Sequence, residues 1–341
     1  MAELSRHHGT PAERRAPVLG GVHIERAPEL ARVVFVGGTG RSGTHVLAQV
    51  LSRNRRLGLV PVEVRFHTDP DGFPGLLAGE VSVDRFLRRL RGYWWRGFQT
   101  ARMRGMFRFV DRDRFDAAVA AFESQFADDP EDACRRLFYD LLWFRAELRP
   151  EGEALVEQST DTIAAAPTLA RLFPEARFIH VVRDGRDASA SRVAQTRGIL
   201  RPRTRAQGIE WWEQRIGAIE AGAGAIPPGR LLTVSLDELL AVGRGRVALR
   251  PMFRFLGAQV TRGARRYYRN HMSPEIAHAE RWREGVSAGR AARIDALYAA
   301  ALERLEARGA RCAPLLRRTY ERRRGAHDLE PVAYVYDRPL P

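Results

Sequence analysis

The chain has 341 residues, of which 56 are basic and 41 acidic, so its formal net charge is +15. All of the basic side chains are arginine because the sequence contains no lysine, which excludes a lysine nucleophile, a lysine Schiff base and the lysine of a standard phosphate-binding loop. With 45% apolar residues the chain can bury a substantial core, while its two cysteines cannot form a disulfide framework or a cysteine zinc site.

The positive charge favours an anionic partner. Arginine is spread along the whole chain, without a basic low-complexity arm or zinc-finger spacing, so we expect a polyanionic small molecule rather than nucleic acid as the main partner. No run approaches the roughly 18–20 apolar residues that a membrane span needs. The polar N-terminus also lacks the apolar core of a signal peptide. We therefore expect a cytoplasmic protein without a membrane span.

The predicted elements begin after a flexible tail at residues 1–30. The first is a strand at 32–36, a short apolar run that is followed by a glycine-rich turn at 37–40. A helix is predicted at about 44–53, and a further strand at 57–60. Continuous apolar runs of this kind, followed by a glycine-rich turn and a helical pattern, are typical of buried parallel strands.

The middle of the chain has a different character. Residues 68–150 begin with a proline- and glycine-rich loop and continue as helical patterns dense in arginine and aromatic residues, which we interpret as a helical insertion. A second strand–turn–helix unit follows, with a strand at 177–182 and a helix from about Ala188. Another strand is predicted at 231–235.

Alternating short strands and amphipathic helices favour an α/β fold, in which a P-loop-like parallel sheet forms the middle of three layers and helices cover both faces. No linker divides the core, so we predict a single domain over 31–325 that contains the helical insertion. Residues 326–341 are expected to form a C-terminal tail.

The turn between the first strand and helix reads Gly38-Thr-Gly-Arg-Ser-Gly-Thr44. Its glycines allow backbone N–H groups to approach an anion, and the helix that follows contributes free donors and a favourable dipole. Arg41 can place a planar fork on phosphate or sulfate oxygens. The turn is not a standard P-loop, because Thr44-His45 stands where Lys-Ser/Thr is required. The turn also does not match the G-x-G-x-x-G dinucleotide pattern.

This segment resembles the 5′-phosphosulfate loop of the sulfotransferases that use 3′-phosphoadenosine 5′-phosphosulfate (PAPS). That family's loop reads roughly Gly-x-x-Arg/Lys-Ser-Gly-Thr-Thr, as Gly38 to His45 does here, with His45 in place of the second threonine. The resemblance implies PAPS as co-substrate, with adenosine 3′,5′-bisphosphate as product. The loop residues implied to bind the donor are Gly40, Arg41, Ser42, Gly43, Thr44 and His45.

A second motif extends the resemblance. In the family, an arginine at a strand end and a serine eight residues later hold the 3′-phosphate, and here these positions are Arg183 and Ser191. The stretch Arg281-Trp-Arg-Glu-Gly285 is similar to the family's loop that closes over the nucleotide, which implies binding roles for Trp282, Arg283 and Gly285. The resemblance covers about 33–63 and 155–289, whereas the insertion between them matches no motif.

The reaction implied is in-line transfer of a sulfuryl group to an acceptor oxygen or nitrogen, with no metal. Arg41 is the candidate cation for the leaving phosphate. Glu63 is the first candidate base, because Glu63-Val-Arg65 is similar to the Glu-x-Arg stretch of the tyrosylprotein branch, and His67 is the second. Gln158 stands where some relatives place a lysine, so a cation such as Arg65 or Arg283 would have to contact the sulfuryl group.

Three other functions remain open from the sequence: an atypical P-loop kinase, a basic nucleic-acid-binding protein, and a sulfotransferase fold that binds the nucleotide without turnover. The acceptor is not named by the sequence. We expect a small molecule or a lipid or glycan intermediate, with peptide tyrosine as a further option. The oligomeric state is not indicated.

Overall fold

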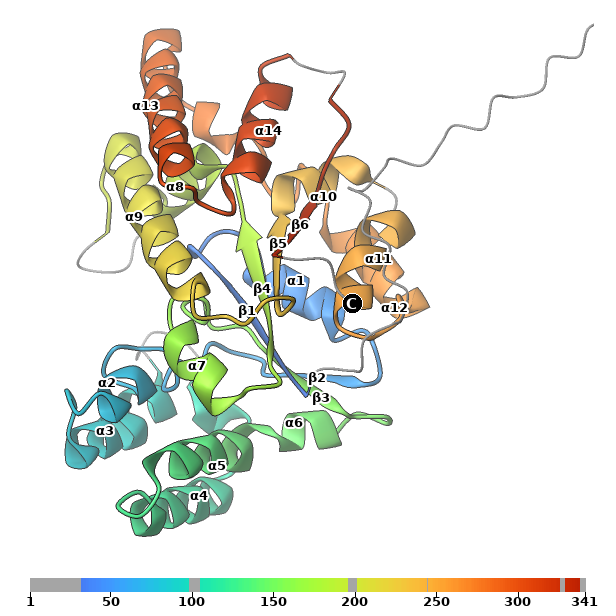
Figure 1. Cartoon of the computed structure of the whole chain (residues 1–341). Helices are drawn as coiled ribbons and strands as arrows, with labels where there is room; N and C mark the ends of the chain where they lie inside the picture. The colour runs from blue at the N-terminus through green and yellow to red at the C-terminus, as the bar shows by residue number, and fades with distance from the viewer. Residues whose placement is uncertain (1–31, 98–104, 196–200, 244, 326–328, 338–341) are drawn as a thin grey trace, which may run out of the picture.

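The computed structural model describes residues 32–97, 105–195, 201–243, 245–325 and 329–337 (Figure 1). The tail predicted at the N-terminus lies outside this described part.

A six-stranded sheet forms the middle of the molecule, with the strand order β2-β3-β1-β4-β5-β6 (Figure 1). The first five strands in this order are mutually parallel, and β6 pairs antiparallel with β5. The strands are β1 (Val33–Gly38), β2 (Leu57–Leu59), β3 (Ala154–Glu157), β4 (Arg177–Val182), β5 (Leu231–Ser235) and β6 (Tyr334–Tyr336). Four of the parallel strands were predicted from the sequence, whereas β3 and β6 were not.

The alternation of side chains along β1 shows why the fold has three layers. Val34 and Val36 pack into one apolar cluster, while Val33 and Phe35 pack into another on the opposite face of the sheet. Because both faces are covered, every residue of β1 is buried. The α/β class with helices on both faces is therefore confirmed.

Four helices pack on the Val34 face: α1 (Thr44–Leu51), α10 (Leu236–Val242), α11 (Gly245–Phe255) and α12 (Arg262–His271). A second group lies on the opposite side and beyond the end of β4: α7 (Ala166–Leu172), α8 (Gly185–Val193), α9 (Arg205–Ala223), α13 (Ala288–Ala307) and α14 (Ala313–Arg323). A short 3-10 turn, η3 (Arg281–Arg283), precedes α13.

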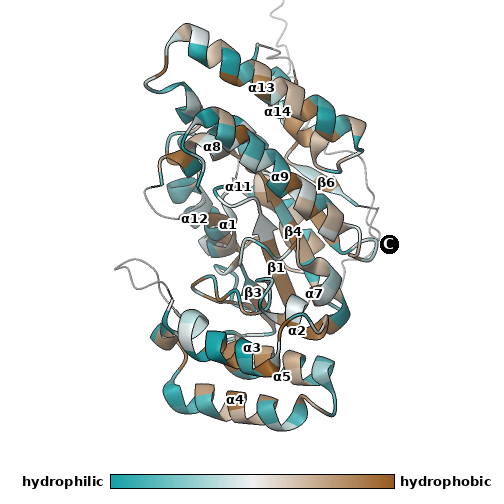
Figure 2. Cartoon of the chain, turned by 90° about the vertical axis from the view of Figure 1, so that its left-hand side faces the viewer, coloured by the Kyte–Doolittle hydropathy of each residue, from teal (hydrophilic) through white to brown (hydrophobic). Residues whose placement is uncertain are grey.

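The segment predicted as a helical insertion is helical in the structure. It contains α2 (Phe73–Leu77), α3 (Val83–Arg89), a π-helical turn η1 (Leu90–Trp94), a 3-10 turn η2 (Met106–Arg108), α4 (Arg112–Gln125), α5 (Pro130–Leu142) and α6 (Phe144–Glu147). Figure 2 shows α4 and α5 at the end of the molecule opposite α13 and α14. The insertion shares one apolar cluster with Phe35 of β1, so it is built onto the sheet.

Residues 326–341 were predicted as a tail, and the structure differs there. Tyr334–Tyr336 forms β6, which adds to the edge of the sheet beside β5. Tyr334 is buried in the apolar cluster on the α1 face. β6 is only three residues long, too short to show a periodic pattern in the sequence.

The π-helical turn of the insertion is tied to the loop that follows β2. Trp94 Nε1 donates to Asp69 Oδ2 at 3.0 Å, and both side chains are buried. The other carboxylate oxygen of Asp69 accepts from Arg65 Nε at 2.9 Å. The insertion thereby fixes the loop that carries Arg65 and its neighbour Glu63.

We expect Trp94→Phe to lower the free energy of unfolding by about 1–3 kcal/mol, because it leaves a buried carboxylate oxygen without its donor. Urea unfolding measures the change. Trp95→Phe is the matched control, because it makes the same exchange at the next residue, which is also buried. The Trp95 indole makes no hydrogen bond to the described residues. Equal losses in the two variants would contradict the role of this hydrogen bond.

Candidate active site

The loop between β1 and α1 has the backbone of an anion-binding turn. Gly40 and Gly43 have φ angles of 78° and 95°, in the left-handed region that favours glycine, and Arg41 also adopts a left-handed φ of 62°. The helix α1 begins at Thr44, and no side chain caps its N-terminus. Its first-turn N–H groups have no intrahelical partners and are available to an anion.

Gly38 is needed where the loop leaves the strand. A Cβ at this position would lie 2.4 Å from Ser42 Oγ and 2.5 Å from the Val181 carbonyl oxygen of β4. The glycine thus lets the loop lie directly against the end of the neighbouring strand. Ser42 Oγ is buried and has no hydrogen-bond partner within the described residues, so it can accept or donate to a ligand of the loop.

The second sequence motif meets the first at this point. Arg183 follows the end of β4, and Ser191 lies in the last turns of α8. Arg41 Nε donates to Ser191 Oγ at 2.9 Å, and Arg183 Nη1 donates to the Arg41 carbonyl at 3.1 Å. The two motifs, far apart in the sequence, therefore form one site at the carboxyl ends of β1 and β4.

Arg183 also reaches a third segment. Its Nη2 atom donates to the carbonyls of Ala277 at 2.5 Å and His278 at 3.3 Å, while its buried Nε has no partner within the described residues. A buried guanidinium N–H without an acceptor is costly in a finished interior. The donor set suits an added anion, since a phosphate oxygen would satisfy it.

The electrostatics of the loop point the same way. Loss of hydration lowers the pKa of Arg41, and three neighbouring guanidiniums lower it further: those of Arg183, Arg192 and Arg281. The carboxylate of Glu63 acts in the opposite direction. A polyanion bound here would relieve repulsion between cations.

Glu63 lies on the loop after β2, within electrostatic reach of Arg41 and Arg65. Its side chain is exposed, yet the surrounding protein restricts its hydration and raises its pKa, against the opposing effect of these two cations. A carboxylate with a raised pKa is better matched to proton transfer near neutral pH than an ordinary glutamate. Glu63 therefore stays the first candidate base.

Gln158 lies directly after β3, at the position where some relatives place a lysine. Its Oε1 atom is 3.0 Å from His45 Nδ1, and its Nε2 donates to the Val60 carbonyl at 3.3 Å. Both ends of the amide are therefore used to hold α1 against β2. The next residue, Ser159, accepts from the Arg65 N–H at 3.3 Å and so supports the loop of Glu63.

His67 does not lie beside Glu63 in the open part of the site. Its side chain is fully buried, with the ring packed against those of Phe35 and Phe138. Its Nε2 atom is 3.0 Å from a carboxylate oxygen of Glu157, which is also fully buried. This environment separates His67 from an acceptor, so Glu63 is the candidate base that faces solvent.

The loop predicted to close over the nucleotide contains both buried and exposed residues. Trp282 is buried, and its ring packs against the guanidiniums of Arg186 and Arg283, whose carbons lie 4.7 and 4.3 Å from the ring centroid. Arg283 and Gly285 are exposed. These contacts give Trp282 a packing role, and its role in binding the nucleotide stays a prediction.

Sequence reasoning missed the contacts that hold this loop. Asp187 Oδ2 accepts from the Glu280 N–H at 2.9 Å, and Asp187 Oδ1 accepts from the Trp282 N–H at 3.3 Å. A carboxylate near a helix start is explained locally by its favourable interaction with the helix dipole. No local pattern indicates a partner 93 residues away.

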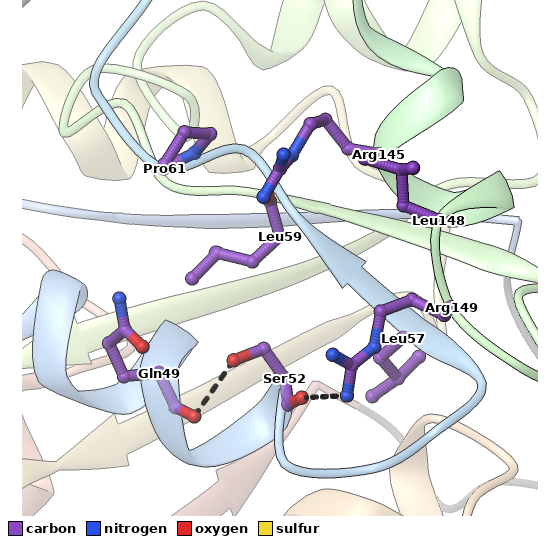
Figure 3. A pocket seen from close by; sticks show the side chains of 8 residues that line it. All are labelled: Gln49, Ser52, Leu57, Leu59, Pro61, Arg145, Leu148 and Arg149. Carbon is purple, nitrogen blue, oxygen red and sulfur yellow. Dashed lines mark hydrogen bonds between the residues drawn. The ribbon is translucent and has the colours of Figure 1, made fainter. Parts of the chain in front are cut away.

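A pocket of about 310 Å³ lies elsewhere, beside the edge strand β2 (Figure 3). Arg149 Nη2 donates to the Ser52 carbonyl at 2.9 Å, and Arg145 Nε donates to the Leu59 carbonyl at 3.1 Å. These two guanidiniums thus bind main-chain oxygens at the end of α1 and on β2. No residue of the loop at 38–45 lines this pocket, whose lining comprises Gln49, Ser52, Leu57, Leu59, Pro61, Arg145, Leu148 and Arg149.

Across the described ranges, His, Cys, Asp and Glu form no group of three or more that could hold a metal ion. In the same part of the chain, no helix combines the length and the apolar character needed to cross a bilayer.

Comparisons with known proteins agree with the resemblance seen in the sequence. A family model described as "Sulfotransferase family" matches residues 33–262, well over half of the chain. The chain matches no curated protein sequence at a significant level.

Solved structures similar to this chain include three sulfotransferases. A sulfotransferase domain from the olefin synthase of Synechococcus PCC 7002 is 17% identical, with a TM-score of 0.45, over 77% of this chain and 92% of that one. A sulfotransferase from Mycobacterium avium is 16% identical, with a TM-score of 0.40, over 82% and 77% of the two chains. A sulfotransferase domain from the curacin biosynthetic pathway is 14% identical, with a TM-score of 0.42, over 73% and 83%.

We expect Gly38→Ala to lower the free energy of unfolding by about 1–3 kcal/mol, because the added methyl group overlaps main-chain and side-chain atoms that cannot both move away. Gly217→Ala in α9 is the control, since a Cβ there meets nothing within 4 Å. It should stabilise the helix by about 0.5–1 kcal/mol. Thermal unfolding distinguishes the two, and a neutral Gly38→Ala would contradict the close approach to β4.

Proposed function

The chain belongs to the sulfotransferase family, and we propose that it transfers a sulfuryl group from PAPS to a hydroxyl or amine of a small-molecule, lipid or glycan acceptor. One observation carries the proposal: Arg41 of the first motif donates to Ser191 of the second at 2.9 Å. The contact unites a loop suited to a phosphosulfate with a strand end suited to a phosphate, as one nucleotide with anionic groups at its 3′ and 5′ positions requires.

The donor is held by two sets of groups in this proposal. The 5′-phosphosulfate lies against the N–H groups at the start of α1, with Arg41 and the hydroxyls of Ser42 and Thr44. The 3′-phosphate is bound by Arg183 and Ser191. The unpaired Nε of Arg183 and the unpaired hydroxyl of Ser42 support this assignment.

The transfer breaks the bond between sulfur and the oxygen bridging to the 5′-phosphate, and forms a bond between sulfur and the acceptor atom. Negative charge grows on the leaving phosphate oxygen, where Arg41 and the aligned N–H groups stabilise it. Glu63 takes the proton from the acceptor. The residues act by positioning two substrates in line and by electrostatics, and the guanidinium of Arg41 stays protonated throughout.

The kinase and the nucleic-acid-binding protein would need different residues from a sulfotransferase. An atypical P-loop kinase would bind ATP with magnesium, and the chain lacks the lysine that P-loop kinases place on the transferred phosphate. A nucleic-acid-binding protein would bind through its distributed arginines, and its affinity would not depend on Ser191. The following titration separates these cases.

Calorimetric titration with adenosine 3′,5′-bisphosphate tests the donor site. We expect micromolar binding by the wild type, weakened at least about tenfold, or about 1.4 kcal/mol, in Arg183→Ala and in Ser191→Ala. Arg304→Ala is the control, because this exposed arginine on α13 pairs with Glu213 and contacts no residue of the site. Absence of binding by the wild type at modest salt would overturn the proposal, and equal binding by all variants would too.

The pH dependence of the reaction tests Glu63. The carboxylate form accepts the proton, so activity is present above its pKa and is lost as the pH falls through it. Because restricted hydration raises this pKa above 4.5, we expect the acidic limb of kcat/KM to lie above that value. Glu63→Gln should lower kcat by about 10²–10⁴-fold and remove the limb. An unchanged limb in Glu63→Gln would assign the proton transfer to another group.

A further inference from the structure

The C-terminal helix α14 lies beyond the residues that the family model matches, and its last residue points into the nucleotide-binding unit. The Arg323 side chain is 10% exposed. Its guanidinium contacts three carboxylates: Nη1 is 3.0 Å from Asp184 and 2.8 Å from Asp187, and Nη2 is 2.8 Å from Asp237. One side chain therefore joins α14 to both α8 and α10.

Each of these carboxylates also binds backbone. Asp184 caps α8 by accepting from the Arg186 N–H at 2.9 Å, directly after the predicted phosphate ligand Arg183. Asp237 accepts from the Asp184 N–H at 2.7 Å. Asp187 accepts from two N–H groups of the segment 278–284, as described above. The cluster thus connects the phosphate-binding arginine with the loop that faces it.

The segment 278–284 needs such support, because its backbone is strained. His278 and Glu280 have left-handed φ angles of 53° and 61°, which cost free energy for residues other than glycine. The N–H of Glu280 is the one that Asp187 holds at 2.9 Å. Without an ionised carboxylate at this point, the conformation of Glu280 loses a charge-assisted hydrogen bond.

Arg323 favours the ionised form of Asp187 more strongly than Arg183 does. Burial raises the pKa of Asp187, and the neighbouring charge of Asp184 raises it further, so this carboxyl tends toward its neutral form. Asp237 also raises this pKa, while Arg323 and, to a smaller extent, Arg183 act in the opposite direction. Burial tends to lower the pKa of Arg323 itself, but the three carboxylates outweigh burial and raise it, which keeps the guanidinium charged. The buried guanidinium of Arg186 pairs with Asp184 and Asp295.

We propose that Arg323 is a positioning residue of the nucleotide site: it holds Asp187 against the backbone of residues 280–282 and so fixes the loop that carries Arg281 and Arg283 beside Arg183. Its link to the nucleotide rests on the proposed function, whereas its hold on the loop does not. The C-terminal helix is in this way part of the donor site without touching the donor.

The chain offers a matched control on the same helix. Arg322 Nη2 lies 3.0 Å from the carboxylate of Glu238, which is fully buried. Arg322→Met therefore removes a guanidinium from a buried carboxylate, as Arg323→Met does, but it leaves Asp187 and the loop untouched. Any effect shared by both variants reflects general loss of stability, and an effect confined to Arg323→Met reflects positioning.

Hydrogen exchange in the unliganded protein is the first measurement. We expect amides of residues 278–284 to exchange at least about tenfold faster in Arg323→Met than in the wild type, with no such change in Arg322→Met. Arg323→Lys, which keeps the charge, should recover part of the protection. If Arg323→Met does not fold, Asp187→Asn serves in its place and should speed exchange in the same segment. Unchanged exchange in the folded variant, or equal acceleration by Arg322→Met, would overturn the proposal.

Kinetics then test the link to the donor. Arg323→Met should raise the KM for PAPS at least about tenfold, leave kcat at saturating PAPS within about twofold, and leave the acceptor KM unchanged. A loss of kcat without a change in the KM for PAPS would contradict positioning of the donor site. If the wild type binds no adenosine 3′,5′-bisphosphate, the proposed function fails, and the exchange experiment still decides whether Arg323 holds the loop.

Discussion

The close approach of Gly38 to the Val181 carbonyl is the constraint on which the site depends. Because Gly38 has no Cβ, the turn after β1 can lie flat against the end of β4. That contact puts Arg41 within reach of Ser191 and puts the Arg41 carbonyl within reach of Arg183. A parallel sheet places the carboxyl ends of its strands at one edge, and this contact turns two adjacent ends into a single binding surface.

The charges around this surface are arranged in two shells. Next to the loop, the guanidiniums of Arg183, Arg192 and Arg281 lower the pKa of Arg41, and Glu63 opposes them. Behind them, the carboxylates of α8 and α10 are paired with Arg186 and Arg323. Three guanidiniums thus act on the pKa of Arg41 against the carboxylate of Glu63, which suits the loop to a polyanionic substrate. The carboxylates behind the loop are paired with guanidiniums and hold it in place.

Using arginine alone makes this arrangement possible. A guanidinium is a planar fork with five donors, so it can join several acceptors at fixed angles, which a lysine ammonium does less well. Arg323 contacts three carboxylates, and Arg183 contacts three main-chain carbonyls. In both cases one side chain joins segments that are distant in sequence.

Local patterns account for what could be predicted. The strands at 177–182 and 231–235 and the start of the helix at Thr44 follow from apolar runs and glycine turns, and the structure has them at those positions. Runs as short as β2, β3 and β6 carry little periodicity, and of these three only β2 was predicted. His67 was a candidate base because histidine suits proton removal near neutral pH, but the insertion packs Phe138 against it, and no pattern near residue 67 indicates that cover.

The central position of β1 has a consequence for how the chain folds. Val33 pairs with Leu155 on one side, so the helical insertion must be looped out before the middle of the sheet can close. Closing so long a loop is entropically expensive and slows folding. The helices α4 and α5, however, are neighbours in sequence and pack on each other, and this hairpin can form from local contacts alone. An insertion that folds early shortens the effective loop, so the same helices that cover the sheet would also set the rate at which its central strands meet.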